Sequence, residues 1–244
     1  MRRVAAERVE TEPGGSASAS VLRYGADLLR RHGVLLGFAF VGLLLPLWVS
    51  GELADEIHEQ EAIAFDEPIL MFAHTMARQG FDDFFVFMSK LGYAGGVVPF
   101  DIALVLVLAV LRKYREAVFA AVALGGSALL NIGAKLFFAR DRPSLWESIA
   151  PETTYSFPSG HAMGSMTLAC VLVMLAWHTR WRWPVLALMV PFVVLVGLSR
   201  VYLGVHYPSD ILAGWAVAMA WAVAVYLSVF RLQGRPWRRR VASD

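Results

Sequence analysis

The sequence predicts an all-α, polytopic membrane protein with six transmembrane helices. Hydrophobic residues make up 57% of the 244 positions and charged residues only 17%, whereas globular proteins carry roughly 25% charged residues. Six segments each hold about 20 mostly apolar residues, the length that a helix needs to cross the hydrocarbon layer. Helices are expected in these segments because lipid cannot satisfy the hydrogen bonds of an exposed backbone.

The N-terminal region is polar and does not have the pattern of a cleaved signal peptide. Residues 1–20 are rich in Ser, Gly, Glu and Arg, which predicts a disordered cytoplasmic tail. Residues 21–32 set Val and Leu among basic residues, as in a short helix on a membrane surface. We therefore predict one membrane domain over 21–232, followed by a basic cytoplasmic tail at 233–244.

The expected spans are residues 33–50, 94–112, 116–138, 161–178, 184–203 and 208–230. Pro99 and Asp101 interrupt the second of them. Asp101 is a candidate functional residue because ionisable groups are rare inside spans, although it also fits a place facing water near the outer end. The sequence leaves its role open.

The segment between the first two spans, residues 51–92, is acidic and its role is also open. Apolar positions within 52–74 allow two interpretations. One is an amphipathic helix on the outer surface that borders an entrance for lipid. The other is a solvated helix packed on the bundle.

Basic residues set the orientation of the spans. Most of the 22 Lys and Arg residues fall in the N-terminal segment, in the connections near 112–115 and 180–182, and in the C-terminal tail. These regions share one side if the spans alternate, so both termini are expected in the cytoplasm, with the protein in the plasma (inner) membrane. A few cations remain on the outer side against this rule: Lys135, Arg140, Arg142 and Arg200.

The first polar cluster, KLFFARDRP, closes the third span at residues 135–143. Lys135 and Arg142 are seven residues apart, so a continuing helix would place both cations on one face. Arg140 and Asp141 would then point elsewhere and pair with each other. The alternative is that the long basic side chains only reach toward the membrane interface.

The second cluster, PSGH at 158–161, precedes the fourth span. The first N–H groups of a helix lack partners within the helix and carry the positive end of its dipole. Gly160 would let an anion approach this backbone, and Ser159 would add a hydroxyl donor. The alternative is an ordinary cap made by Ser159, with His161 lying at the interface.

The third cluster, SRVYLGVHYPSD, covers residues 199–210. Arg200 ends the fifth span, and Pro208 suits the first position of the sixth helix. Asp210 follows His206 by four residues and can accept a hydrogen bond from one imidazole nitrogen. That bond fixes the tautomer and leaves the other nitrogen free as a nucleophile or base. The alternative is an incidental turn histidine with Asp210 as a helix cap.

Together the three clusters predict a phosphate-binding pocket on the outer side. Several cations and a helix N-terminus there suit a multiply charged oxyanion. Two histidines suit covalent phosphoryl transfer, one as nucleophile and one as general acid. The single cysteine, Cys170, lies in an apolar run, and no residues show the spacing of a metal site. We therefore expect no metal and no other cofactor.

These clusters resemble the signature of the type-2 phosphatidic acid phosphatase superfamily, and the six-span layout resembles its integral-membrane branch. The matching positions are Lys135, Arg142, Pro143, Pro158, Ser159, Gly160, His161, Ser199, Arg200, His206 and Asp210. The resemblance implies a catalytic core like that of the vanadium haloperoxidases. It further implies that vanadate inhibits as a phosphate mimic.

The resemblance also implies a role for each matched polar residue. His206 would attack phosphorus to form a phosphohistidine, and Asp210 would orient it. His161 would protonate the leaving oxygen and later activate water. The non-bridging oxygens would be held by Lys135, Arg142, Ser159, Gly160 and Arg200.

A site at the outer ends of the spans lies at the membrane interface, where a lipid head group would also lie. The expected function is hydrolysis of a phosphomonoester or pyrophosphate lipid, with undecaprenyl pyrophosphate, phosphatidylglycerophosphate and phosphatidic acid as candidate substrates. Phosphate transfer from lipid to lipid is an alternative, and a phosphate or lipid transporter without turnover is another. Neither nucleic-acid binding nor a particular oligomeric state is predicted.

Overall fold

The structure is a computed structural model that describes residues 33, 37 and 40–231. The chain divides into two units, Met1–Phe40 and Val41–Asp244. The predicted tails, 1–20 and 233–244, and the predicted surface helix at 21–32 lie outside the described residues. Within these residues every regular element is helical, as the sequence predicts.

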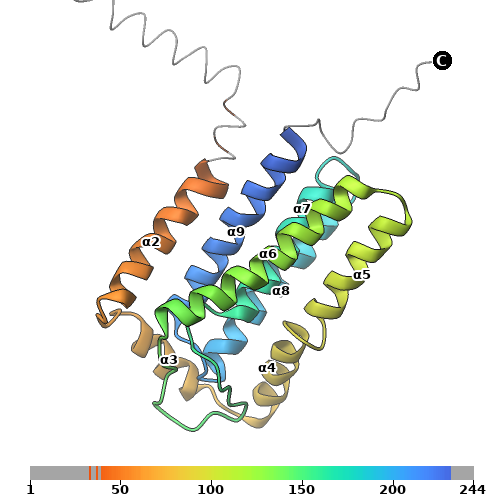
Figure 1. Cartoon of the computed structure of the whole chain (residues 1–244). Coiled ribbons are helices and arrows are strands. Elements are labelled where there is room, and N and C mark those ends of the chain that lie inside the picture. The colour runs from red at the N-terminus through yellow and green to blue at the C-terminus, as the bar shows by residue number, and fades with distance from the viewer. Residues whose placement is uncertain (1–32, 34–36, 38–39, 232–244) are drawn as a thin grey trace, which may run out of the picture. The chain divides into compact units, whose positions relative to one another are not determined.

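The helices follow one another along the chain with short connections, except after α6. In order they are η1 (Phe40–Leu44, a π-helical turn), α2 (Leu45–His58), α3 (Asp66–Thr75), α4 (Gln79–Leu91), α5 (Val97–Val110), α6 (Tyr114–Phe138), α7 (Gly160–Ala176), α8 (Arg182–Tyr202) and α9 (Pro208–Arg231). Figure 1 shows α2, α5, α6, α7, α8 and α9 as a bundle of long helices, with α3 and α4 at one end of it.

The apolar segments expected to span the membrane all contain helix, but their lengths differ. Among the helices that the structure describes, three are long and apolar enough to cross a bilayer: α6, α8 and α9. The apolar helices α5 and α7 have 14 and 17 residues, fewer than the roughly 20 that a full crossing needs. The all-helical part of the predicted fold is thus confirmed, and the six crossings stay a prediction.

The first expected span differs most from its helix. Helix α2 does not end near residue 50 but continues to His58. Residues 52–58, ELADEIH, are mostly good helix formers, so the helix extends although its sequence becomes polar. The following acidic segment also contains helices, α3 and α4, and the fully buried Leu70 of α3 packs it against the bundle.

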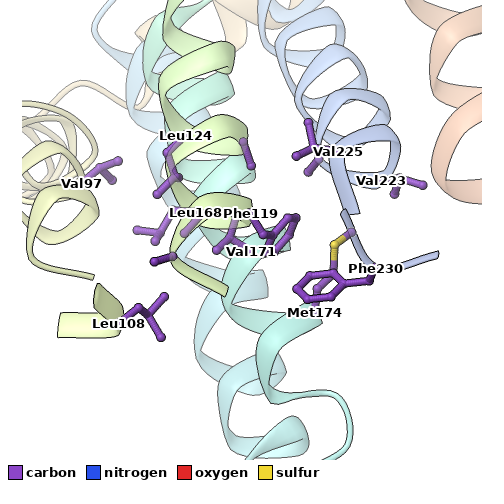
Figure 2. Packing of buried hydrophobic residues seen from close by; sticks show 14 residues of the cluster. Val97, Leu108, Phe119, Leu124, Leu168, Val171, Met174, Val223, Val225 and Phe230 are labelled. Atoms are coloured by element: carbon purple, nitrogen blue, oxygen red, sulfur yellow. The ribbon is translucent and has the colours of Figure 1, made fainter. Parts of the chain in front are cut away.

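The core of the bundle lies around α7, which contacts α5, α6, α8 and α9. Figure 2 shows Leu168 and Val171 of α7 beside Phe119 of α6, with Phe230 of α9 close by. Small residues allow this close approach. A Cβ at Gly126 of α6 would lie 2.4 Å from the Trp221 ring of α9, so glycine is required where that indole packs.

Large apolar side chains also cover the outside of the bundle. Examples with more than half of their surface exposed are Leu106, Val107, Val110, Leu129, Ile132, Leu136, Leu188 and Val190. So many exposed apolar side chains would be unfavourable in water and suit contact with lipid tails.

The two ends of the bundle differ in what they carry. The connections at 111–113 and 177–181 lie at the end where α2 begins and α9 ends (Figure 1). The long connection between α6 and α7, residues 139–159, lies at the opposite end with α3 and α4. The expected basic connections therefore share one end, and the three polar clusters share the other.

Candidate active site

Helix α6 does not continue through the first cluster, residues 135–143, although a continuing helix was expected there. Helix α6 ends at Phe138 because Ala139 adopts a left-handed conformation with φ of 46°. Arg142 therefore lies on the irregular connection and not two turns above Lys135 on one helix. Both cations still reach the same segment: Lys135 Nζ donates to Thr154 Oγ1 at 3.4 Å, and Arg142 Nη2 donates to the same oxygen at 3.0 Å.

The expected pair between Arg140 and Asp141 is wrong. Arg140 Nη2 lies 2.8 Å from Asp66 Oδ2, and Arg140 Nη1 lies 2.6 Å from Asp210 Oδ1. The turn at Ala139 redirects the chain after α6. The guanidinium of Arg140 consequently meets the starts of α3 and α9.

The start of α7 combines a helix cap with a close backbone approach. Ser159 Oγ accepts a hydrogen bond from the Ala162 N–H at 3.4 Å, so the capping interpretation of Ser159 is confirmed. Asn131 Nδ2 of α6 donates to the Pro158 carbonyl at 2.9 Å. A Cβ at Gly160 would lie 3.0 Å from Asn131 Oδ1, which shows how tightly this turn packs on α6.

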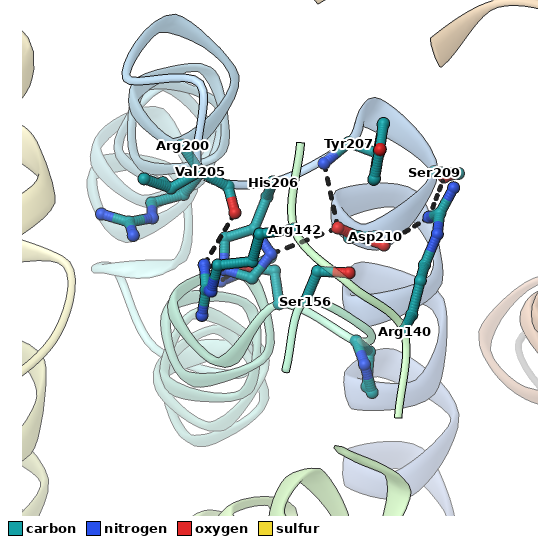
Figure 3. A network of polar contacts seen from close by, with 12 residues as sticks. Arg140, Arg142, Ser156, Arg200, Val205, His206, Tyr207, Ser209 and Asp210 are labelled. Carbon is teal, nitrogen blue, oxygen red and sulfur yellow. Dashed lines mark hydrogen bonds and ion pairs between the residues drawn. The ribbon is translucent and has the colours of Figure 1, made fainter. Parts of the chain in front are cut away.

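His206 and Asp210 form a buried pair at the α8–α9 turn, as the spacing predicts. His206 Nδ1 lies 3.3 Å from Asp210 Oδ2, and Tyr207 N–H donates to the same oxygen at 2.9 Å. On the other side of the ring, Nε2 lies 3.2 Å from Arg142 Nη1. Because a guanidinium can only donate, this contact favours the tautomer with the proton on Nδ1. Figure 3 shows the His206 ring between Arg142 and Asp210.

Arg200 supplies a buried cation on the opposite wall. Its side chain is 1% exposed, and it donates to Ser89 Oγ of α4 and to the Glu152 carboxylate. Its buried Nε has no hydrogen-bond partner among the described residues. A donor in this state can bind an additional oxyanion without giving up an existing bond.

The carboxylate of Glu152 lies among the cations and histidines of the site. Its Oε2 lies 2.7 Å from Arg142 Nη2, and its Oε1 binds Arg200 Nη2. The same carboxylate lies 3.9 Å from both His161 Nδ1 and His206 Nε2. An anion is thus held between two guanidinium groups and two imidazoles, in the place where the sequence predicts phosphate.

Charge and burial set the protonation of the pocket. Burial lowers the pKa of His206 well below its ordinary value, and the cations of Arg200 and Arg142 lower it further. Burial alone would raise the pKa of Glu152, but the nearby cations, Arg200 foremost, outweigh it and lower the pKa. At neutral pH the pocket therefore holds a neutral His206 and an ionised Glu152.

Several residues that contact this site were not predicted from the sequence. The missed contacts are made by Asp66, Ser89, Tyr93, Asn131 and Glu152. Tyr93, for instance, places its ring 4.9 Å from that of His161. Only Asn131 had a usable signal, since a polar amide inside an apolar span usually has a structural or functional partner.

Comparison with known proteins places the chain in a family. The family model described as PAP2 superfamily matches residues 116–233. Phosphatidylglycerophosphatase B of Bacillus subtilis (strain 168) is 30% identical over 175 residues, covering 68% of this chain and 84% of the relative. The chain belongs to the PAP2 superfamily. This confirms the membership that the three motifs predict.

A solved structure and a further relative of this PAP2 chain are also named as phosphatases. A crystal structure described as a transmembrane PAP2 type phosphatidylglycerolphosphate phosphatase from Bacillus subtilis superposes with a TM-score of 0.65 at 26% identity, covering 74% of this chain and 93% of that one. Undecaprenyl-diphosphatase BcrC of Bacillus subtilis (strain 168) is 38% identical over 64 residues, which are 26% of this chain and 30% of the relative.

Proposed function

We propose that this PAP2 protein is a membrane lipid phosphatase that works through a phosphohistidine intermediate. One observation carries the proposal: His206 Nε2 lies 3.9 Å from the Glu152 carboxylate, an anionic group that Arg142 and Arg200 already hold. The phosphatase activities named for the relatives support the same reaction.

In the first half-reaction the substrate phosphate takes the place of the Glu152 carboxylate. The Nε2 lone pair of His206 attacks phosphorus, and the bond between phosphorus and the lipid oxygen breaks. Asp210 accepts the Nδ1–H bond and stabilises the positive charge that develops on the ring. A proton from His161 neutralises the leaving oxygen.

In the second half-reaction a water molecule attacks the phosphohistidine. His161, now neutral, takes a proton from that water, and the bond between Nε2 and phosphorus breaks to release inorganic phosphate. Lys135, Arg142 and Arg200 would stabilise the charge on the non-bridging oxygens in both steps. Ser159 and the Gly160 amide are proposed to add donors at the start of α7.

The pocket is proposed to face the exterior of the plasma membrane, with both termini in the cytoplasm. The connections rich in Lys and Arg lie at the opposite end of the bundle (Figure 1), and such connections stay on the cytoplasmic side. A lipid head group at the outer leaflet would then lie at the depth of the pocket. Phosphatidylglycerophosphate, phosphatidic acid and undecaprenyl pyrophosphate are the proposed substrates.

The test is release of inorganic phosphate by the purified protein in detergent. A panel of phosphatidylglycerophosphate, phosphatidic acid, undecaprenyl pyrophosphate and lipid A phosphates is assayed in the presence of EDTA. We expect turnover of at least one of these lipids despite the EDTA, because no step of the proposed mechanism uses a metal ion. No release from any lipid would refute the function, and a strict requirement for added metal would refute the mechanism.

A further inference from the structure

Behind the catalytic pair lies a second layer of charged groups that the reaction above does not use. Asp210 lies between the His206 ring and the Arg140 guanidinium (Figure 3). Arg140 reaches past Asp210 to a second carboxylate, Asp66, at the first residue of α3. Only 4% of the Asp66 side chain and 15% of that of Arg140 are exposed, so both charges are largely shielded from water.

These groups are held by several bonds each. Asp66 Oδ1 accepts the Ser209 N–H at 2.9 Å, and Asp66 Oδ2 accepts the Ser209 hydroxyl at 2.6 Å. Arg140 Nη1 donates to the same hydroxyl at 2.8 Å. The Arg140 guanidinium also stacks on the Tyr207 ring, 4.1 Å from its centroid. Side chains with this many fixed contacts hold one geometry.

We propose that Arg140 and Asp66 are positioning residues that set the charge and orientation of Asp210, and through it the basicity of His206. The proposal rests on the function proposed above. The single guanidinium of Arg140 forms ion pairs with two carboxylates, those of Asp66 and Asp210. Asp66 therefore determines how much of that charge acts on Asp210, and Asp210 determines how strongly His206 holds a proton.

The signs of the two effects are opposite. Without the Arg140 charge, the Asp210 carboxylate is less compensated and stabilises the protonated His206 more, so the His206 pKa rises. Without the Asp66 charge, Arg140 acts on Asp210 alone, so the His206 pKa falls. Two residues that only held α3 on α9 would have no reason to move this pKa in opposite directions.

Other charged groups also face His206, and the Arg140 and Asp66 variants described below leave them unchanged. They are Lys135 of α6, Arg142 and Glu152 of the α6–α7 connection, His161 of α7, Arg200 of α8 and Asp210 of α9. Because all of these remain in each variant, a change in the His206 pKa reports the layer behind Asp210.

The experiment measures the His206 pKa by NMR titration of histidine-labelled protein in detergent, with the signal assigned from His206→Gln. Arg140→Gln is expected to raise the pKa by about 1, and Asp66→Asn to lower it, in the range that a single close charge produces. Arg180→Gln is the matched control, because Arg180 lies over Trp181 at the other end of the bundle. This control should leave the pKa unchanged.

Turnover gives a second readout. In Arg140→Gln the acid limb of kcat/KM should move to higher pH, since it follows the free enzyme's base. We expect kcat to fall about 10-fold with KM little changed, as for loss of an interaction made in the transition state. Arg140→Lys should recover only part of kcat, because an ammonium cannot bridge both carboxylates as a guanidinium does.

The proposal is wrong if the His206 pKa of Arg140→Gln is not higher than that of the wild type over the pH range in which the protein stays folded. A shift of the same sign in Arg140→Gln and Asp66→Asn would also overturn it. If Arg140→Gln fails to fold, the isosteric Asp66→Asn decides: its His206 pKa must be lower than that of the wild type, or the proposal is wrong. The titration needs no turnover, so it is independent of whether any lipid is hydrolysed.

Discussion

At the scale of single residues, the carboxylate of Glu152 explains how a pocket rich in cations is stable without substrate. Arg200 is 1% exposed, and a buried charge without a counterion is costly. Glu152 supplies that counterion, and its own side chain is 29% exposed, so it can leave toward solvent. Phosphate and Glu152 should therefore compete for Arg142 and Arg200.

This competition predicts the effect of Glu152→Gln on the binding of inorganic vanadate. The variant keeps the shape of the side chain but loses its charge, so vanadate should bind about 10-fold more tightly or better, since a hydrogen bond to a charged group is worth about 1.5–3 kcal/mol. Calorimetric titration in detergent measures the Kd. Unchanged or weaker binding would show that Glu152 does not compete with the anion.

The sequence predicted the residues that act within a short motif and missed those that act across long distances. His206 and Asp210 are four residues apart at a helix start, so local spacing alone placed them together. Glu152 and Arg140 lie on an irregular connection whose path depends on the left-handed Ala139. No periodicity predicts such a path, and the partner of Arg140, Asp66, lies 74 positions away.

At the scale of elements, the turn between α8 and α9 positions the nucleophile. Gly204 has φ of +67°, and a Cβ there would lie 2.6 Å from the Trp146 ring. The Trp146 ring in turn stacks on His74 of α3, with centroids 4.2 Å apart. The turn that carries His206 is thus fixed from outside by the α6–α7 connection and α3.

Gly204→Ala is predicted to impair both stability and turnover. A left-handed conformation costs a residue with a Cβ roughly 1–2 kcal/mol, and the Trp146 ring must also move. The melting temperature should fall by several degrees, and kcat should fall because His206 is displaced. Gly125→Ala in α6 is the control, since a Cβ there meets nothing within 4 Å. Equal behaviour of the two variants would contradict this role of the turn.

The starts and ends of the helices could be predicted from the sequence only in part. The expected start of the last helix at Pro208 is confirmed, because proline suits the first helical position. The end of α2 at His58 was missed, because hydropathy marks where a helix leaves lipid and not where it stops. The apolar pattern predicted the bundle, and the apolar positions within 52–74 predicted a helix that the structure shows as α3 packed on the bundle, whereas α4 was not predicted.

At the scale of the whole molecule, the fold brings together motifs from distant parts of the chain. Lys135 comes from α6, His161 from α7, Arg200 from α8 and Asp210 from α9. All of them lie at the end of the bundle where α3 and α4 cover it (Figure 1). We propose that this assembly forms a covalent phosphoenzyme on His206.

The most direct test of that claim is to trap the intermediate. The wild-type protein is mixed with a lipid substrate labelled with ³²P in its phosphate and is quenched in alkaline detergent, where phosphohistidine is stable. His206→Ala is run in parallel, with His58→Ala as control, since His58 stacks on Phe137 outside the pocket. We expect label on the wild-type and His58→Ala proteins, none on His206→Ala, and turnover of His206→Ala reduced on the order of 10⁴-fold or more. Near-normal turnover by His206→Ala, or label on another residue, would contradict it.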